Sequence, residues 1–183
     1  MIIDQAVARF KQLRVGSHSM DLDCGPLISD NQKKRVHGFI DRAKKDGIPV
    51  LAEAQMADGL PSGGFYVAPV LFGPVPRENS LACDEVFGPV LSIIPFEDEA
   101  DAVKLANATQ FGLVAGIWTR DGARQMRVAK KMRCGQVFVN GYGAGGGIEL
   151  PFGGVKKSGH GREKGMEALK EFSHTKTIVF KHG

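Results

Sequence analysis

The sequence has little cysteine, no long apolar run and no basic leader. Its three cysteines are odd in number, and none forms a CxxC pair. This argues against a disulfide framework and favours a reducing, cytoplasmic compartment. No stretch approaches the roughly 18 apolar residues that a transmembrane helix needs. An acid, Asp4, stands near the start where a secretory signal would carry basic residues, so we expect no signal peptide.

Signals for metal and nucleic-acid binding are also missing. The five histidines are scattered, and none lies at zinc-ligand spacing from another histidine or a cysteine. The formal net charge is only +4 over 183 residues, which is not the strong basic excess typical of a nucleic-acid-binding protein. We therefore expect no metal, no nucleic acid and no membrane among the partners.

What the sequence does contain is enough apolar material for a folded core. Of its 183 residues, 43% are hydrophobic and 24% charged, at a length that suits one domain or slightly more. Charge is unevenly spread, since residues 61–110 carry two basic and seven acidic side chains, whereas residues 111–183 carry thirteen and five. Eleven of the 24 glycines lie between Gly135 and Gly165, which indicates a turn-rich segment.

Hydrophobic periodicity predicts two helices and two strands in the first half. The helix expected over residues 2–13 begins without a capping residue, which we interpret as a sign that the chain is part of a longer one. Ser29 or Asp30 can cap a second helix, over residues 30–45, with an apolar face. Short strands are expected over residues 49–52 and 66–72, the second near a sheet edge because Pro69 interrupts it.

The second half alternates strands with helices, which predicts a parallel sheet with helices packed on it. After the glycine-rich stretch we expect one more helix and a final strand with period-two alternation. The expected strands are residues 90–96, 113–119, 136–140 and 175–181, and the expected helices are residues 97–108, 121–132 and 163–172.

One glycine pattern resembles a dinucleotide-binding fingerprint. Gly141, Gly143 and Gly146 fit GxGxxG directly after the predicted strand 136–140. That mechanism needs a helix N-terminus immediately after the glycines, to hold the pyrophosphate. Pro151 and further glycines follow instead. A loop that lines a cavity is therefore the favoured interpretation.

Other reactive or charged residues have simple structural interpretations. The cysteines Cys24, Cys83 and Cys134 lack a neighbour that would activate a thiolate, and His160 lies between two glycines in a predicted loop. The predicted helix 121–132 carries a run of basic side chains that could bind an anion, although a solvated face is favoured. That run comprises Arg124, Arg127, Lys130, Lys131 and Arg133.

Dense motifs in a fixed order carry the strongest functional signal. They are DEVFGPV at 84–90, FGLVAGIWTRD at 111–121, QVFVN at 136–140, LPFGGVKKSGHGRE at 150–163 and TKT at 175–177. In this order they resemble the C-terminal part of an NAD(P)-dependent aldehyde dehydrogenase, over nearly the whole chain. The resemblance implies an α/β fold: a three-layer-like catalytic domain with a mainly parallel sheet over residues 1–173. It also implies an oligomerisation strand at residues 174–183 that joins a neighbouring subunit's sheet, and hence a homo-oligomer.

The same resemblance implies roles for individual residues. Glu85 matches the glutamate that binds the ribose next to nicotinamide, and Phe87 matches the aromatic packed near that ring. Glu163 matches an accessory carboxylate that assists proton transfer through water. The remaining matches shape the aldehyde pocket and are Tyr142, Ile148, Glu149 and Phe152.

In that family a cysteine thiolate attacks the aldehyde, a hydride passes to NAD or NADP, and the thioester is hydrolysed. The family's nucleophile, general-base glutamate and cofactor domain all lie upstream of the part that this chain resembles. We therefore expect this chain to be inactive alone and to bind no cofactor by itself. A non-catalytic assembly or interaction module that retains the oligomerisation strand is the alternative. The sequence leaves open which aldehyde is oxidised and whether NAD or NADP is used.

Overall fold

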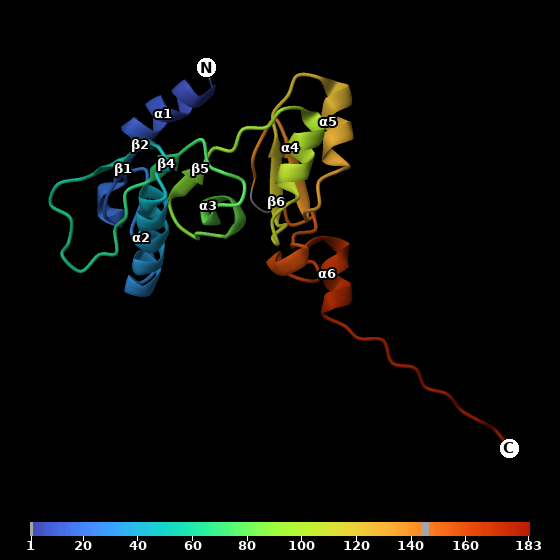
Figure 1. The fold of residues 1–183 in the computed structure, drawn as a ribbon. Coiled ribbons are helices and arrows are strands. Elements are labelled where there is room, and N and C mark those ends of the chain that lie inside the picture. The colour runs from blue at the N-terminus through green and yellow to red at the C-terminus, as the bar shows by residue number, and fades with distance from the viewer. Residues whose placement is uncertain (1, 144–146) are drawn as a thin grey trace. The chain divides into compact units, whose positions relative to one another are not determined.

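The computed structural model describes residues 2–143 and 147–183. The chain divides into two compact units, Met1–Pro95 and Phe96–Gly183. Each unit has its own helices and strands (Figure 1), and each is described below by itself.

The first unit contains two small sheets flanked by helices. In the larger sheet β4 is central, with β2 antiparallel on one side and β5 parallel on the other. In the smaller sheet β1 and β3 pair in parallel. The elements are α1 (Ile2–Gln12), β1 (Arg14–Val15), the 3-10 helix η1 (His18–Met20), α2 (Asp30–Lys45), β2 (Val50–Glu53), β3 (Gln55–Met56), β4 (Val70–Phe72), α3 (Ser80–Cys83) and β5 (Val90–Ser92).

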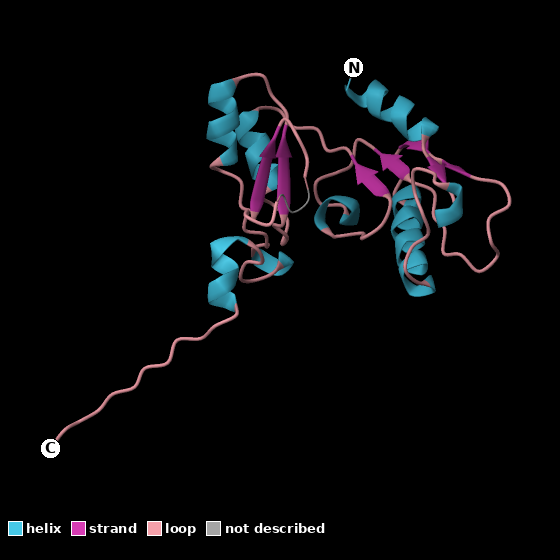
Figure 2. Cartoon of the chain, turned by 180° about the vertical axis from the view of Figure 1, so that it is seen from behind, coloured by secondary structure: helices cyan, strands magenta, loops and turns pink. Residues whose placement is uncertain are grey.

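Helix α2 provides one side of the core of this unit. Ser29 caps it as expected, with its hydroxyl accepting a hydrogen bond from the Gln32 amide at 3.2 Å. The apolar face predicted for this helix is buried and packs with Val70 and Phe72 of β4. Leu71, also fully buried, points to the opposite face because side chains alternate along a strand. Helices α1 and α2 lie on opposite sides of the sheet (Figures 1 and 2), which gives three layers.

The expected edge position of the 66–72 strand is wrong. The strand is shorter, Val70–Phe72, and it is the central strand of its sheet. Pro69 lies just before it, so the missing proline N–H costs no ladder hydrogen bond. The Pro69 carbonyl oxygen instead accepts a hydrogen bond from the Ala54 amide at 2.8 Å.

The second unit is built on one parallel strand pair. Strands β6 and β7 align from Val114 opposite Gln136 to Ile117 opposite Val139, which confirms the predicted parallel pairing of these two segments. Strand β5 pairs with β4 of the first unit, so the single sheet expected over residues 90–140 is wrong. The elements are α4 (Glu99–Ala106), β6 (Val114–Ile117), α5 (Gly122–Ala129), β7 (Gln136–Val139), the 3-10 helix η2 (Lys156–Ser158) and α6 (Gly165–Glu171).

Aspartates cap helices α4 and α5 of this unit. The Asp98 carboxylate accepts a hydrogen bond from the Asp101 amide at 2.8 Å, and that of Asp121 accepts one from the Arg124 amide at 3.0 Å. Helix α5 ends at Ala129, three residues before the expected end. The basic residues that follow therefore lie beyond the helix, which corrects the expectation that one helix carries the whole basic run.

The C-terminal segment forms no strand within the described residues. After Phe172 the chain has no regular secondary structure and extends away from α6 (Figure 1). The strand expected at 175–181 therefore does not form within the single chain, and its pairing with a neighbouring subunit stays a prediction, since strand main-chain groups need a partner strand to pair with. Its apolar side chains Ile178, Val179 and Phe180 are exposed.

Among the described residues, no helix combines the length and apolar character needed to cross a bilayer.

A carboxylate on α4 connects the two helices that flank β6. Glu99 accepts hydrogen bonds from Arg127 at 2.7 Å and from Arg124 at 3.1 Å. The Arg127 hydrogen bond, opposed by desolvation and reinforced by Arg124, lowers the pKa of Glu99 from 4.5 to about 2. The electrostatic link between α4 and α5 therefore depends on ionised Glu99.

We predict that Glu99→Gln lowers the Tm by a few degrees at pH 7. Because the folded pKa lies below the ordinary value of 4.5, this stabilisation is present above pH 4.5 and is lost as pH falls toward about 2. The exposure of the two arginines reduces the effect through solvent screening. Thermal unfolding between pH 2 and 7 measures it, with Glu97→Gln as the matched control. Equal Tm values for Glu99→Gln and the parent protein at pH 7 would contradict the prediction.

Candidate functional site

The segment 84–90 lies against the N-terminal half of α2. The Gln32 side-chain amide donates to the Val86 carbonyl oxygen at 3.2 Å and to that of Phe87 at 2.6 Å. The Arg35 guanidinium donates to the Glu85 carbonyl oxygen at 2.6 Å. Two side chains about one helical turn apart thus hold three successive carbonyl groups in place.

This backbone placement turns two of the predicted site residues toward solvent. Val86 is 9% exposed and belongs to the core around α2. Its neighbours Glu85 and Phe87 are exposed, and Phe87 is 70% exposed. Phe87 has φ 57°, a left-handed conformation that is costly for a non-glycine residue. The hydrogen bond from Gln32 to its carbonyl oxygen supports that conformation.

Gly88 lets this segment approach α2 closely. A Cβ at Gly88 would collide with the side chain of Val36, which is fully buried. Glycine is therefore the residue that fits here, because it has no Cβ.

Sequence reasoning missed the supporting roles of Gln32 and Arg35, and it identified Val36 only as part of the apolar face of the helix. They lie about 50 positions before the segment they hold. Their only sequence signal is their spacing, which places them on one face of a predicted helix.

In the second unit, two predicted site residues are paired directly. Phe152 and Glu163 form an antiparallel bridge, with both N–H···O distances at 2.7 Å. Helix α6 begins only at Gly165, so the expectation that Glu163 opens the helix is wrong. The Glu163 side chain is exposed, and the Lys164 ammonium lies 5.6 Å from the centre of the Phe152 ring.

Polar side chains and close glycine contacts shape the surrounding loop. The Gln136 side-chain amide donates to the Pro151 carbonyl oxygen at 3.0 Å, which fixes the loop beside Phe152 to β7. Arg162 donates to the carbonyl oxygens of Gly154 at 3.0 Å and Gly161 at 2.6 Å. A Cβ at Gly135 would collide with the Gly153 carbonyl oxygen.

An open pocket of about 520 Å³ lies beside this bridge. Phe152, His160 and Glu163 are among its lining residues, so His160 belongs to the wall of a pocket. Its lining combines two phenylalanine rings with ionisable side chains and four glycines.

The other predicted pocket residues are exposed on the segment after β7. The Tyr142 ring lies 6.3 Å from the Phe138 ring, and Ile148 and Glu149 project toward solvent. The Gly165 amide donates to the Ile148 carbonyl oxygen at 2.9 Å, which ties this segment to the start of α6. The structure therefore places Ile148 and the Phe152–Glu163 bridge on one connected loop system.

The glycine fingerprint has no helix after it. Gly141 and Gly143 follow β7, and Gly146 lies outside the described residues. Residues 147–155 contain no helix, which agrees with the interpretation of this segment as a loop.

None of the cysteines is placed as an activated thiol. Burial raises the pKa of the Cys24 and Cys134 thiols, which opposes thiolate formation. The Cys83 thiol donates to the Arg77 carbonyl oxygen at 3.2 Å. The described part of the chain also has no cluster of three or more His, Cys, Asp or Glu side chains suited to a metal ion.

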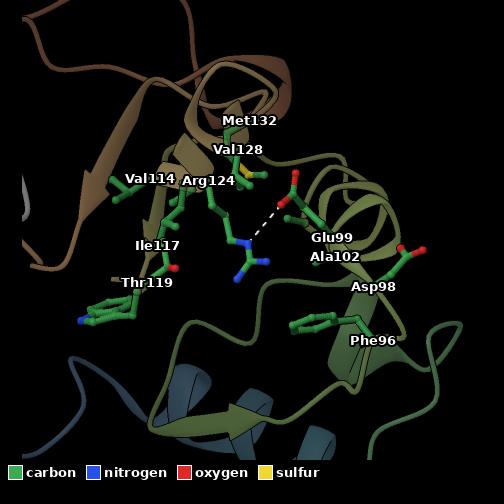
Figure 3. A pocket seen from close by; sticks show the side chains of 14 residues that line it. Phe96, Asp98, Glu99, Ala102, Val114, Ile117, Thr119, Arg124, Val128 and Met132 are labelled. Atoms are coloured by element: carbon green, nitrogen blue, oxygen red, sulfur yellow. Dashed lines mark hydrogen bonds and ion pairs between the residues drawn. The ribbon is translucent and has the colours of Figure 1, made fainter. Parts of the chain in front are cut away.

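A larger pocket, of about 720 Å³, lies between α4, α5 and β6 (Figure 3). Its walls are mostly apolar, with Val114, Ile117 and Val128 among them. Arg124 and Glu99 form an ion pair at one side of it. It contains none of the residues predicted for the cofactor or aldehyde sites.

Comparison with known proteins identifies the family. Residues 1–178 match the model of the Aldehyde dehydrogenase family. The chain belongs to this family. It is 37% identical to a betaine aldehyde dehydrogenase of Rhizobium etli, over 84% of this chain and 31% of that protein. It is 36% identical to a 4-trimethylaminobutyraldehyde dehydrogenase of Oryzias latipes, over 99% of this chain and 36% of that protein. The chain thus spans about a third of the length of these relatives.

Solved structures show the same fold. A Burkholderia cenocepacia protein assigned as an aldehyde dehydrogenase superposes with a TM-score of 0.93 at 57% identity, covering 100% of this chain and 38% of that one. A Mycobacterium tuberculosis aldehyde dehydrogenase complexed with NAD+ superposes with a TM-score of 0.84 at 35% identity, covering 100% of this chain and 38% of that one. The aldehyde dehydrogenases are a family of oxidoreductases. The α/β structure of this chain, with its parallel strand pairs, agrees with membership of that family.

We predict that Gly88→Ala destabilises the protein by about 1–3 kcal/mol, because the added methyl group overpacks the contact with Val36. Denaturant unfolding measures the loss. The double variant Val36→Ala/Gly88→Ala should lose less than the sum of the two single variants, since Val36→Ala removes the colliding atoms. Gly25→Ala is the matched control, because a Cβ there meets open space. If the losses of stability in the two single variants add up to the loss in the double variant, the contact between Gly88 and Val36 does not determine how closely the segment approaches α2.

Proposed function

We propose that the chain forms part of the catalytic domain of an NAD(P)-dependent aldehyde dehydrogenase. In this proposal residues 1–173 provide walls around the nicotinamide and the aldehyde, and residues 174–183 mediate assembly. The main support is the segment 85–87, whose backbone is held by α2 while the Glu85 carboxylate and the Phe87 ring face solvent. Because the backbone is already fixed, little conformational entropy is lost when the two proposed functional side chains bind a ligand.

The two side chains suit the nicotinamide end of the cofactor. The Glu85 carboxylate has two acceptor oxygens, which match the two hydroxyl groups of a ribose. The exposed Phe87 ring offers an apolar wall for a planar heterocycle. NAD(P)+ would supply the hydride acceptor when bound, and these two residues would bind and orient its reactive end.

The second unit supplies the proposed aldehyde pocket. Phe152, Tyr142 and Ile148 provide apolar surface, and Glu149 lies next to Ile148 as a candidate specificity residue. The Phe152–Glu163 bridge fixes the backbone of the proposed accessory carboxylate beside the pocket of about 520 Å³. Glu163 would there hold or move a proton through water.

We further propose that the chain does not oxidise aldehydes alone. The motivation is the lack of an activated thiol among Cys24, Cys83 and Cys134, because the covalent route requires a thiolate nucleophile. Tight cofactor binding by the isolated chain is also not expected, because Glu85 and Phe87 would reach only the nicotinamide end. The alternative is a non-catalytic assembly module, favoured by the exposed apolar tail.

A chimaeric enzyme tests the proposed function. This chain replaces the matching 38% of the Burkholderia cenocepacia relative, to which it is 57% identical. We expect aldehyde-dependent reduction of NAD or NADP by the chimaera and none by the isolated chain. In the chimaera, Glu85→Gln should raise the KM for the cofactor by roughly tenfold, because a charge-assisted hydrogen bond is weakened.

Asp84→Asn is the control for that variant, since Asp84 is the neighbouring exposed carboxylate. A folded chimaera without activity would favour the assembly alternative. An unchanged cofactor KM in Glu85→Gln would remove Glu85 from the cofactor site. Steady NAD reduction by the isolated chain, abolished by Cys24→Ala, would contradict the expected inactivity.

Assembly is tested on the tail. We predict that the 183-residue chain forms a homodimer or larger oligomer, because an unpaired apolar segment favours association. Light scattering on the full chain and on a variant ending at Phe172 measures this. A monomeric full chain at high concentration would contradict the prediction. An oligomer that survives the truncation would show that the tail is not the contact.

A further inference from the structure

The structure divides the basic run of residues 124–133 into two groups. Arg124 and Arg127, on α5, are both hydrogen-bonded to Glu99. The three later cations lie beyond the end of the helix, and none of them forms an ion pair with the described residues. These three are Lys130, Lys131 and Arg133.

The topology brings a fourth cation to the same place. Strands β6 and β7 are parallel, and α4 and α5 each lead by a short connection into one of them. The C-terminal ends of both helices therefore lie at the same end of the strand pair, the end at which β6 and β7 begin. The two helices lie side by side (Figures 1 and 2). Lys104, in the last turn of α4, lies at this end of the strand pair, and it too has no ion-pair partner among the described residues.

The four cations line one open pocket of about 590 Å³, which we call the cationic pocket. No carboxylate is among its lining residues. The lining consists of Ala100, Val103, Lys104, Asn107, Lys130, Lys131, Met132 and Arg133.

The pocket has a fixed floor. The Asn107 side chain donates to the Lys131 carbonyl oxygen at 2.8 Å and accepts from the Arg133 amide at 2.7 Å. The Lys156 ammonium donates to the Asn107 carbonyl oxygen at 3.0 Å and to that of Thr109 at 2.9 Å. The main chain that carries two of the four cations is thus tied to the connection after α4.

Main-chain amides, not the four cationic side chains, cap the ends of the two helices, and four positive charges exceed the roughly half negative charge at each helix C-terminus. The main-chain amide of Asn107 already donates to the carbonyl oxygens of Val103 and Leu105 at the end of α4. The Lys130 amide does the same for Met126 and Val128 at the end of α5. The side chains are therefore available to a ligand, and their mutual repulsion falls when an anion binds between them.

We propose that the cationic pocket binds a multivalent phosphate-bearing anion. Four positive charges around one opening favour a ligand with several negative charges, since a monovalent anion is readily exchanged with bulk salt. Lysine ammonium groups and an arginine fork are the side chains that bind phosphate oxygens. The site is independent of the proposed dehydrogenase site, because none of its residues belongs to that site.

Calorimetry with sodium tripolyphosphate, on the full chain, tests the proposal. The variant Lys104→Gln/Lys130→Gln/Lys131→Gln/Arg133→Gln removes the four pocket charges. The control Lys157→Gln/Lys170→Gln/Lys176→Gln/Lys181→Gln removes the same charge from elsewhere in the same unit. We expect one site, with affinity reduced roughly tenfold or more in the pocket variant and little changed in the control, because each exposed charge pair contributes modestly.

The binding should also weaken as NaCl rises, and it should shift the NMR signal of the Asn107 amide in the parent chain. Because all four substituted side chains are exposed, circular dichroism should show an unchanged fold. Equal loss of affinity in both variants would show attraction by net charge alone and would overturn the proposal. So would an absence of binding by the parent chain. If poly-glutamate binds the parent chain as tightly as tripolyphosphate does, and with the same loss in the pocket variant, the proposal is overturned in favour of an acidic protein partner.

Discussion

Close approach of the main chain to its neighbours is the constraint on which both parts of the proposed site depend. Gly88 lets the segment 84–90 lie on α2, against Val36, where any Cβ would collide. In the second unit, Gly135 lets β7 approach the carbonyl oxygen of Gly153. These contacts are possible only for glycine, and they bring the main chain close enough for side-chain donors to hold its carbonyl groups.

Those donors are polar side chains on regular elements. Gln32 and Arg35 on α2 hold the segment of Glu85 and Phe87, and Gln136 on β7 holds the loop of Phe152. In both places the side chains proposed for the site lie on a connection, while a helix or strand supplies rigidity. This division is common in enzymes, because a fixed scaffold limits the conformational freedom of the loop that carries the chemistry.

Charge in the second unit has two separate roles. Glu99 joins α4 to α5 through Arg124 and Arg127, whereas four other cations surround a pocket without a carboxylate. In the basic run, Arg124 and Arg127 therefore stabilise the unit through Glu99. Lys130, Lys131 and Arg133 have no ion-pair partner among the described residues. The difference arises because α5 ends at Ala129. Beyond that residue the side chains no longer follow the helical spacing that faces Glu99.

The sequence by itself determined helices α1, α2, α4 and α5, the apolar face of α2, the parallel pairing of β6 with β7 and the family, but it did not predict the short elements β1, β3 and α3. Caps such as Ser29, Asp98 and Asp121 act over three residues, so local patterns suffice to find them. Only the tertiary structure decided that β4 is central, that Glu163 pairs with Phe152 and that Gln32 supports Phe87. These features depend on contacts between residues far apart in the chain, whose partners no local periodicity specifies. The tail at 175–181 shows the same limit, because its alternation is compatible with a strand while a strand requires a partner that the described residues do not provide.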